Sequence, residues 1–157
     1  MKKNETVEAW FECKVIYDKT MENGMKKTVT ELYLVQSCDF NFAESRIIEE
    51  IAPFISGEFI VSSIRRVKLS GLFPSQEEAA YKWYKCKLLF ITLDEKSGAE
   101  KKTAAMMLVQ ADDLRNAVKN LDEGMKGTMA DYQIASIAET PIMDVYPFKA
   151  DGEVVRS

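Results

Sequence analysis

Histidine is missing from this chain of 157 residues. Catalytic triads and metal sites that depend on an imidazole are therefore excluded. The sequence also has no glycine-rich phosphate loop, no nucleophile elbow and no cysteine placed beside a base. Without these motifs we expect no catalytic residue, no metal and no cofactor, and an enzyme is the less favoured interpretation.

Cysteine, long apolar runs and an excess of one charge are also lacking. Three cysteines, an odd number, argue against a disulfide scaffold, and we expect Cys13 and Cys86 to be buried as small hydrophobic side chains. No apolar run approaches the roughly 20 residues of a membrane helix. A net charge of -4 gives no overall attraction to nucleic acid or anionic lipid. We therefore expect a cytoplasmic protein with no membrane partner.

The sequence does contain an internal repeat. Residues 10–17 (WFECKVIY) recur as residues 83–90 (WYKCKLLF), and similar residues continue to match along both halves. Gly24 matches Gly98, for example, in a predicted turn. Such self-similarity predicts two copies of one structural unit, because a repeated sequence pattern specifies a repeated fold.

The repeats define the expected domain organisation. Hydrophobic residues make up 46% of the chain, which is enough for one real core. We predict a single domain, 1–157, built of two repeats at about 9–73 and 82–147. Residues 74–81 are the predicted linker, and residues 148–157 are expected to form a flexible tail.

Each repeat is expected to begin with a β-hairpin. In residues 10–17 the residue types alternate with the period of a strand that has one buried face. Gly24 and Gly98 mark the turns that fold these first strands back. The returning strands are expected at residues 28–36 and 103–110.

A helix is expected after each hairpin, because apolar residues recur at spacings of three and four. These residues are Phe40, Ala43, Ile47, Ile48 and Ile51 in the first repeat and Leu114, Ala117, Val118 and Leu121 in the second. Asn41 and Glu44 resemble a capping box. Asp112 or Asp113 is the expected cap of the second helix.

A last strand is expected at residues 59–68 and again at 132–140. The apolar residues change parity at the same place in both copies, which predicts a β-bulge. Each repeat is therefore a β-β-α-β unit. We predict an internally duplicated α+β fold in which a mainly antiparallel six-stranded sheet carries two helices about a pseudo-two-fold axis. A half-barrel with exchanged strands is the alternative.

Two tryptophans are the first binding candidates. Trp10 and Trp83 lie on the strand face opposite the predicted core residues. Each could be a stacking platform for a base, a nucleotide ring or a partner side chain. Alternatively they cover a sheet edge or the seam between repeats, which is the favoured interpretation because large aromatic residues dominate ordinary packing.

Basic residues form the second candidate group. Basic side chains interleaved with aromatic residues on a strand are typical of single-stranded nucleic-acid binders, and the same cluster could bind another anionic ligand. The speculative binding residues are Trp10, Trp83, Tyr84, Lys85, Lys87, Arg65, Arg66 and Lys68. A solvated strand face is the favoured alternative, because Glu12 replaces Lys85 in the first repeat.

Two carboxylates are the third candidate group. Glu139 and Asp144 flank Pro141, where the last strand is expected to end and could line a cleft. Paired acids can perform general acid and base chemistry when their surroundings separate their pKa values. The spacing places no second acid beside either residue, so these two are cleft candidates only.

The chain resembles a family of bacterial and bacteriophage proteins known as a domain of unknown function. The similarity lies in the segments WFECKVIYDKTMENGMKKTVTELYLV, FAESRIIEEI, KWYKCKLLFITLDEKSGAEKK, MLVQADDLRNAV and ETPIMDVYPF. It spans nearly everything from Trp10 to Phe148. The resemblance implies no activity, cofactor or site residue, and only a loose association with phage biology.

Three functional hypotheses follow. The leading one is a non-enzymatic binding or assembly protein of unknown partner, possessing a sheet edge through which a homodimer could form. The second is a single-stranded nucleic-acid binder. The third is a nucleotide-type small-ligand binder or enzyme with a site between the repeats, near Glu139 and Asp144.

Overall fold

The computed structural model describes residues 8–148, which form two compact units. Unit 1 extends to Lys68 and resumes at Ile142, and unit 2 is Leu69–Pro141. Each unit consists of a four-stranded mixed sheet and one α-helix, so the predicted α+β class is confirmed.

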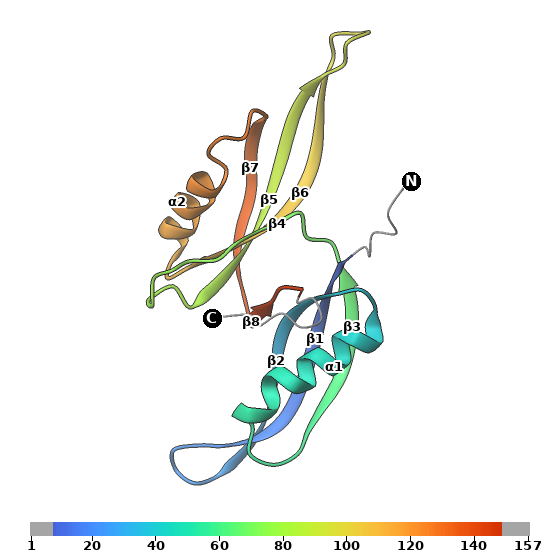
Figure 1. The fold of residues 1–157 in the computed structure, drawn as a ribbon. Coiled ribbons are helices and arrows are strands. Elements are labelled where there is room, and N and C mark those ends of the chain that lie inside the picture. The colour runs from blue at the N-terminus through green and yellow to red at the C-terminus, as the bar shows by residue number, and fades with distance from the viewer. Residues whose placement is uncertain (1–7, 149–157) are drawn as a thin grey trace. The chain divides into compact units, whose positions relative to one another are not determined.

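Unit 1 is a sheet of strand order β3-β1-β2-β8. Its elements are β1 (Ala9–Thr20), β2 (Lys26–Ser37), α1 (Phe40–Ile51), the 3-10 helix η1 (Ala52–Phe54), β3 (Phe59–Val67) and β8 (Ile142–Tyr146). Strand β1 pairs antiparallel with β2 and β3, whereas β8 is parallel to β2. Helix α1 packs across β1, β2 and β3 on one face of the sheet (Figure 1).

Unit 2 has the same design, with the strand order β4-β6-β5-β7. Its elements are β4 (Gly71–Phe73), β5 (Lys82–Leu93), β6 (Glu100–Ala111), α2 (Leu114–Gly124) and β7 (Asp131–Thr140). Strand β4 is parallel to β6, and β5 is antiparallel to β6 and β7. Helix α2 contacts β4, β6 and β7 (Figure 1).

Both hairpins turn at the predicted glycines. Gly24 has a φ of 81° and Gly98 a φ of 69°, values that glycine adopts without the steric penalty of a Cβ atom. Each turn allows a long antiparallel pairing that extends from Thr20 with Lys26 to Ala9 with Ser37 in unit 1. The hairpins are therefore longer than the sequence pattern predicts.

The helices begin at aspartates. Asp39 accepts a hydrogen bond from the backbone N–H of Phe42 at 2.9 Å, and Asp113 accepts one from that of Asn116 at 2.8 Å. The predicted cap at Asp113 is confirmed. The predicted capping box of Asn41 with Glu44 is wrong, because Asp39 already has the extended backbone and the short acceptor that an N-cap needs.

Each unit has its own apolar core between sheet and helix. The core of unit 1 includes Phe11, Cys13, Val15, Val35, Ile47 and Ile51, and that of unit 2 includes Tyr84, Cys86, Leu88, Val109, Leu121 and Met125. Cys13 and Cys86 are both fully buried, as predicted. Burial raises the pKa of the Cys13 thiol to about 12, with a contribution from Glu12, and that of Cys86 to about 11.

The predicted bulges are present in both units. Lys14 pairs with Ser63 while Val15 pairs with Val61, so β3 has one extra residue at that point. The pairing of β5 with β7 shifts in the same way between Lys87 and Leu88. The parity change in the sequence therefore predicted the β-bulge of each unit correctly.

The prediction of one six-stranded sheet with a shared apolar interior is wrong. The described residues form two four-stranded sheets with separate cores. The reason is that two short strands, β4 and β8, were not anticipated and occupy the free edges of β6 and β2. Because β8 already pairs on the edge of β2, and β4 on the edge of β6, the two hairpins cannot pair with each other along those edges.

Each short strand pairs with the hairpin of the other predicted repeat. Strand β4 follows the first repeat's last long strand but pairs with β6, and β8 follows β7 but pairs with β2. The half-barrel alternative anticipated such an exchange, although each sheet has only four strands. The two units therefore do not coincide with the two predicted repeats.

A glutamine anchors the chain after each short strand. The Gln36 side-chain oxygen accepts a hydrogen bond from the backbone N–H of Phe148 at 3.0 Å. In unit 2 the Gln110 oxygen accepts one from Ser75 at 2.9 Å. The same side chain at the end of β2 and of β6 thus satisfies one backbone donor in each unit.

The remaining sequence predictions concern the connections and the membrane. The predicted linker, 74–81, forms neither helix nor strand. The predicted tail lies outside the described residues except for Phe148. Within residues 8–148, no helix is long and apolar enough to cross a membrane.

The packing of β4 on α2 generates a prediction. A Cβ atom added at Gly124 would lie 2.6 Å from the Phe73 ring. In an unobstructed helix, alanine would stabilise by up to about 1 kcal/mol relative to glycine. Here overpacking costs roughly 1–3 kcal/mol, so we expect Gly124→Ala to lower the free energy of unfolding by about 1 kcal/mol in urea.

The control is the same substitution in a Phe73→Ala background, where the obstructing ring is gone. There Gly124→Ala should stabilise the protein instead. An equal effect in both backgrounds would contradict the contact.

Candidate functional site

The aromatic residues that the sequence singled out differ in exposure. Trp10 is partly exposed on β1. Trp83 and Tyr84 are each only 3% exposed, and Tyr84 belongs to the core of unit 2. The backbone carbonyl of Trp83 accepts a hydrogen bond from the Thr140 hydroxyl at 2.8 Å. This placement favours packing over stacking for Trp83 and Tyr84.

The basic candidates do not belong to one unit. Arg65, Arg66 and Lys68 are exposed in unit 1, and Lys85 and Lys87 are exposed on β5 of unit 2. The Arg65 guanidinium forms an ion pair with Glu12 at 2.9 Å, across β1 and β3. Its charge is therefore already balanced locally, which weakens this group as a phosphate-binding surface.

The two cleft carboxylates also belong to different units. Glu139 is an exposed residue of unit 2 and forms an ion pair with Lys82 at 3.5 Å. Its charge raises the pKa of Lys82. Asp144 belongs to β8 and thus to unit 1. Of these two carboxylates, Asp144 lines the pocket described below and Glu139 does not.

A pocket of about 240 Å³ lies within unit 1. It is lined by Tyr17, Glu31, Tyr33, Ile51, Phe54, Ile55, Met143, Asp144 and Tyr146. These residues come from β1, β2, the end of α1, η1 and β8. The lining combines three phenol rings and two carboxylates with an aliphatic and aromatic wall, which is the composition of a small-ligand site.

Tyr17, Glu31 and Tyr33 line this pocket from strands β1 and β2. Because residues 31 and 33 are two apart on β2, their side chains share one face of the sheet. The Tyr33 hydroxyl donates to the Glu31 carboxylate at 2.9 Å. Burial raises the pKa of Tyr33 and of Tyr17, and the charge of Glu31 raises both further.

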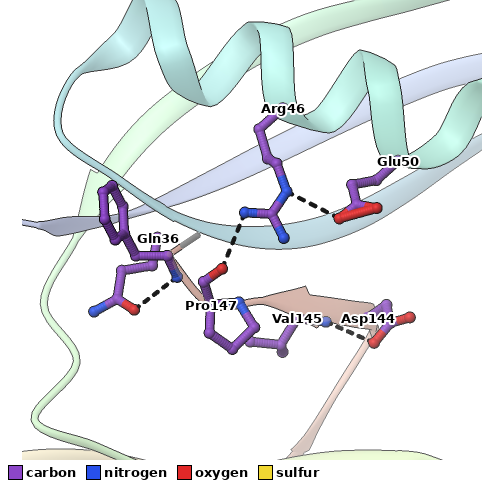
Figure 2. Close-up of polar contacts among 7 residues, drawn as sticks. Gln36, Arg46, Glu50, Asp144, Val145 and Pro147 are labelled. Atoms are coloured by element: carbon purple, nitrogen blue, oxygen red, sulfur yellow. Dashed lines mark hydrogen bonds and ion pairs between the residues drawn. The ribbon is translucent and has the colours of Figure 1, made fainter. Parts of the chain in front are cut away.

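Asp144 reaches the pocket from the edge strand β8. One of its carboxylate oxygens accepts a hydrogen bond from the backbone N–H of Val145 at 2.8 Å (Figure 2). Loss of water around the carboxyl raises its pKa, the hydrogen bond lowers it, and the charge of Glu50 raises it again. The net shift is upward, so the folded protein holds this charge unfavourably.

Arg46 of α1 ties β8 to the helix. Figure 2 shows its guanidinium between Glu50, at 2.9 Å, and the backbone carbonyl of Pro147, at 3.0 Å. The same group lies 5.8 Å from the ring centre of Tyr146, a cation–π distance. Burial raises the pKa of Tyr146 to about 12, and the charges of Asp144 and Glu50 raise it while Arg46 opposes them.

Tyr146 also stacks on Tyr33. Their ring centres are 6.1 Å apart and the rings are 18° from parallel. Strand β8 brings them together, because Tyr33 pairs with Asp144 and the next-but-one residue of β8 is Tyr146. The pocket therefore depends on the parallel pairing of β8 with β2.

The two sheets have equivalent strand pairings, so each polar residue of the pocket has an equivalent position in unit 2. Cys13 pairs with Tyr33 as Cys86 pairs with Met107, and this alignment extends along both hairpins. The matched pairs are Tyr17 and Phe90, Glu31 and Ala105, Tyr33 and Met107, Asp144 and Gly71, and Tyr146 and Phe73. Every polar group of the pocket is replaced by an apolar residue or by glycine.

The side chain of Met107 takes up space in unit 2 next to Gly71. A Cβ atom added at Gly71 would lie 2.5 Å from its sulfur. Phe73 likewise lies directly against α2 at Gly124, whereas the residue of unit 1 that matches Gly124 is Glu50. The same fold is therefore completed by apolar packing in one unit and by a polar pocket in the other.

Sequence reasoning missed Tyr17, Glu31, Tyr33 and Tyr146. A signal existed in the sequence, since Glu31 and Tyr33 align with Ala105 and Met107 of the second predicted repeat. Only the pairing with β8, however, reveals that Asp144 lies beside them. Within residues 8–148, the pocket included, no group of three or more histidine, cysteine, aspartate or glutamate side chains could hold a metal ion.

Comparisons with known proteins identify a family but no function. Neither the search of curated proteins nor the search of solved structures found a match. A family model described as a domain of unknown function, DUF4494, matches residues 9–148. Because the match covers most of the chain, the resemblance to a domain of unknown function is confirmed. The chain belongs to the DUF4494 family.

Proposed function

We propose that this is a non-enzymatic binding protein and that the pocket of unit 1 is its ligand site. The observation that carries the proposal is the contrast between the two units. Unit 1 places Glu31, Tyr33 and Asp144 where unit 2 places Ala105, Met107 and Gly71. The fold tolerates apolar residues at these positions, so stability does not require the polar ones.

The raised pKa of Asp144 supports this proposal. A carboxylate whose charged form is disfavoured in the folded state lowers stability at neutral pH. Binding sites commonly hold residues that reduce stability, because the ligand supplies the missing interactions. Asp144 fits that description, since its main-chain partner satisfies only part of its hydrogen-bonding capacity.

Binding is preferred to catalysis for a chemical reason. A carboxyl with a raised pKa can also be a general acid. Among the described residues of the pocket, however, the one hydrogen bond between side chains runs from the Tyr33 hydroxyl to the Glu31 carboxylate, and the raised pKa of this phenol means that it is not activated as a nucleophile. A nucleotide is disfavoured as well, because Glu31 and Asp144 would repel its phosphates.

Internal duplication is a further part of the proposal. It is supported by the matched bulges, the buried Cys13 and Cys86, and the anchors Gln36 and Gln110. Homodimerisation through the exposed edge of β3 or β7 is compatible with both sheet orders. A cytoplasmic location and a phage or mobile-element association stay predictions.

A ligand screen tests the binding function. The double variant Glu31→Ala, Tyr33→Met copies residues that unit 2 already accommodates, so it should fold. We expect at least one compound of a metabolite library to raise the melting temperature of the native chain and not that of the variant. At a concentration of 100 Kd the stabilisation should be about 2.7 kcal/mol.

The control for this screen is Lys85→Ala with Lys87→Ala, in unit 2. It should keep the response to the ligand. Loss of the response in this control, with retention in the pocket variant, would transfer the function to the basic strand face.

Asp144 gives a second test through pH. Its pKa is raised by folding, so below the unfolded value both states are protonated and the residue contributes nothing. As pH rises, the unfolded chain ionises first and the folded state loses stability. Asp144→Asn should therefore stabilise the protein at pH 7, and the gain should vanish near pH 3 in urea unfolding.

Asp94 is the matched control, because its pKa is lowered by the backbone N–H of Lys96 and then by the Ser97 hydroxyl. Asp94→Asn should destabilise the protein at pH 7, and this effect should also disappear at low pH. A loss of stability on Asp144→Asn at pH 7 would contradict the upward direction of the Asp144 pKa shift.

A further inference from the structure

The charges around the pocket are predominantly negative. Glu31 and Asp144 line it, and Glu50 is close enough to raise the pKa of both Asp144 and Tyr146. Arg46 is the nearby cation, but Glu50 and the Pro147 carbonyl already hold its guanidinium. Among the described residues that line the cavity there are two carboxylates and no lysine or arginine, so a ligand of positive charge would be attracted there.

The aromatic surfaces point to the same class of ligand. Three phenol rings, those of Tyr17, Tyr33 and Tyr146, line the pocket. The face of an aromatic ring attracts cations, and Arg46 shows that Tyr146 accepts a guanidinium at 5.8 Å. Because the Tyr33 hydroxyl uses only part of the Glu31 carboxylate, Glu31 can accept further hydrogen bonds from a ligand.

The volume of the cavity and the chemistry of its wall restrict the ligands that can bind there. The cavity of about 240 Å³ is smaller than the range of roughly 300–1,000 Å³ for drug-sized ligands. Ile51, Phe54, Ile55 and Met143 supply an apolar wall that could cover a short hydrocarbon chain. A compact charged head on an aliphatic stem matches both the volume and the lining.

We infer that the pocket of unit 1 binds an alkylammonium or alkylguanidinium group. The inference rests on the proposed binding function and specifies its ligand. Glu31 and Asp144 accept hydrogen bonds from the cationic head, the tyrosine rings surround it, and the apolar wall covers the stem. The head can belong to a free amine or to a lysine or arginine side chain of a partner, because the chemistry is the same.

The experiment is a titration followed by 1H–15N correlation spectra of the full chain. The probes are n-butylammonium and n-butylguanidinium, with pentanamide as neutral match and butyrate as anionic match. We expect the two cations to shift the amide signals around Glu31 and Asp144 with a Kd of about 1 mM or tighter. The neutral and anionic probes should leave these signals unchanged at the same concentrations.

Variants that remove one charge without changing side-chain size identify the partners. Glu31→Gln and Asp144→Asn should each weaken binding of the cations about tenfold, which corresponds to about 1.4 kcal/mol. Glu44→Gln, on the exposed surface of α1, is the matched control and should leave the Kd unchanged. Equal affinities in all three variants would overturn the inference.

Two further arms separate the sources of the cation. Nα-acetyl-lysine amide and Nα-acetyl-arginine amide represent a protein side chain, and tighter binding of either than of the free amines would identify a peptide partner. Tighter binding of the free amines would identify a metabolite. In both cases the cationic class is upheld.

Failure of this inference is distinguishable from failure of the proposed function. If only pentanamide or butyrate binds, and the Glu31→Ala, Tyr33→Met variant loses that binding, the site stands and the cationic class is wrong. If the cations bind equally well to that variant, the pocket is not the site and both proposals fall. If no probe binds, the inference of a cationic ligand is overturned. The library screen then tests the proposed binding function separately.

Discussion

The parallel pairing of β8 with β2 is the contact on which the rest of unit 1 depends. It closes the edge of the sheet, stacks Tyr146 on Tyr33 and places Asp144 next to the hairpin. Besides the backbone pairing and the buried Val145, the Gln36 carboxamide and the Arg46 guanidinium hold the contact, because each binds the backbone just after the strand. A five-residue strand has little pairing energy of its own, so these side chains matter.

The two units form a controlled comparison within one chain. Both use an aspartate cap, a buried cysteine and a bulged third long strand, so the scaffold is the same. They differ where β8 and β4 meet their sheets. Unit 2 packs Met107 and Phe73 into that corner, whereas unit 1 leaves a cavity with two carboxylates. This contrast is the basis of our proposal that unit 1 holds a ligand site.

Candidate sites were harder to predict than elements. Trp83 and Tyr84 are speculative binding residues because they are aromatic and adjacent to lysines, whereas packing is the favoured interpretation of Trp83. The fold buries both. Asp144 was selected because it follows a strand end, and it does reach a pocket. Glu139 was selected on the same ground and pairs with Lys82 at the surface. Proximity in sequence could not separate these cases, because side-chain surroundings are made by other strands.

The sequence by itself determined the local structure: two hairpins with turns at Gly24 and Gly98, two amphipathic helices, two bulges and two buried cysteines. Each of these depends on periodicity or on one residue's backbone preference, which a single segment contains. The tertiary structure alone decided that there are two sheets and that Glu31, Tyr33 and Asp144 share a pocket. Strands as short as β4 and β8 specify no partner or register by their own pattern, so their pairing emerges only when the whole chain packs.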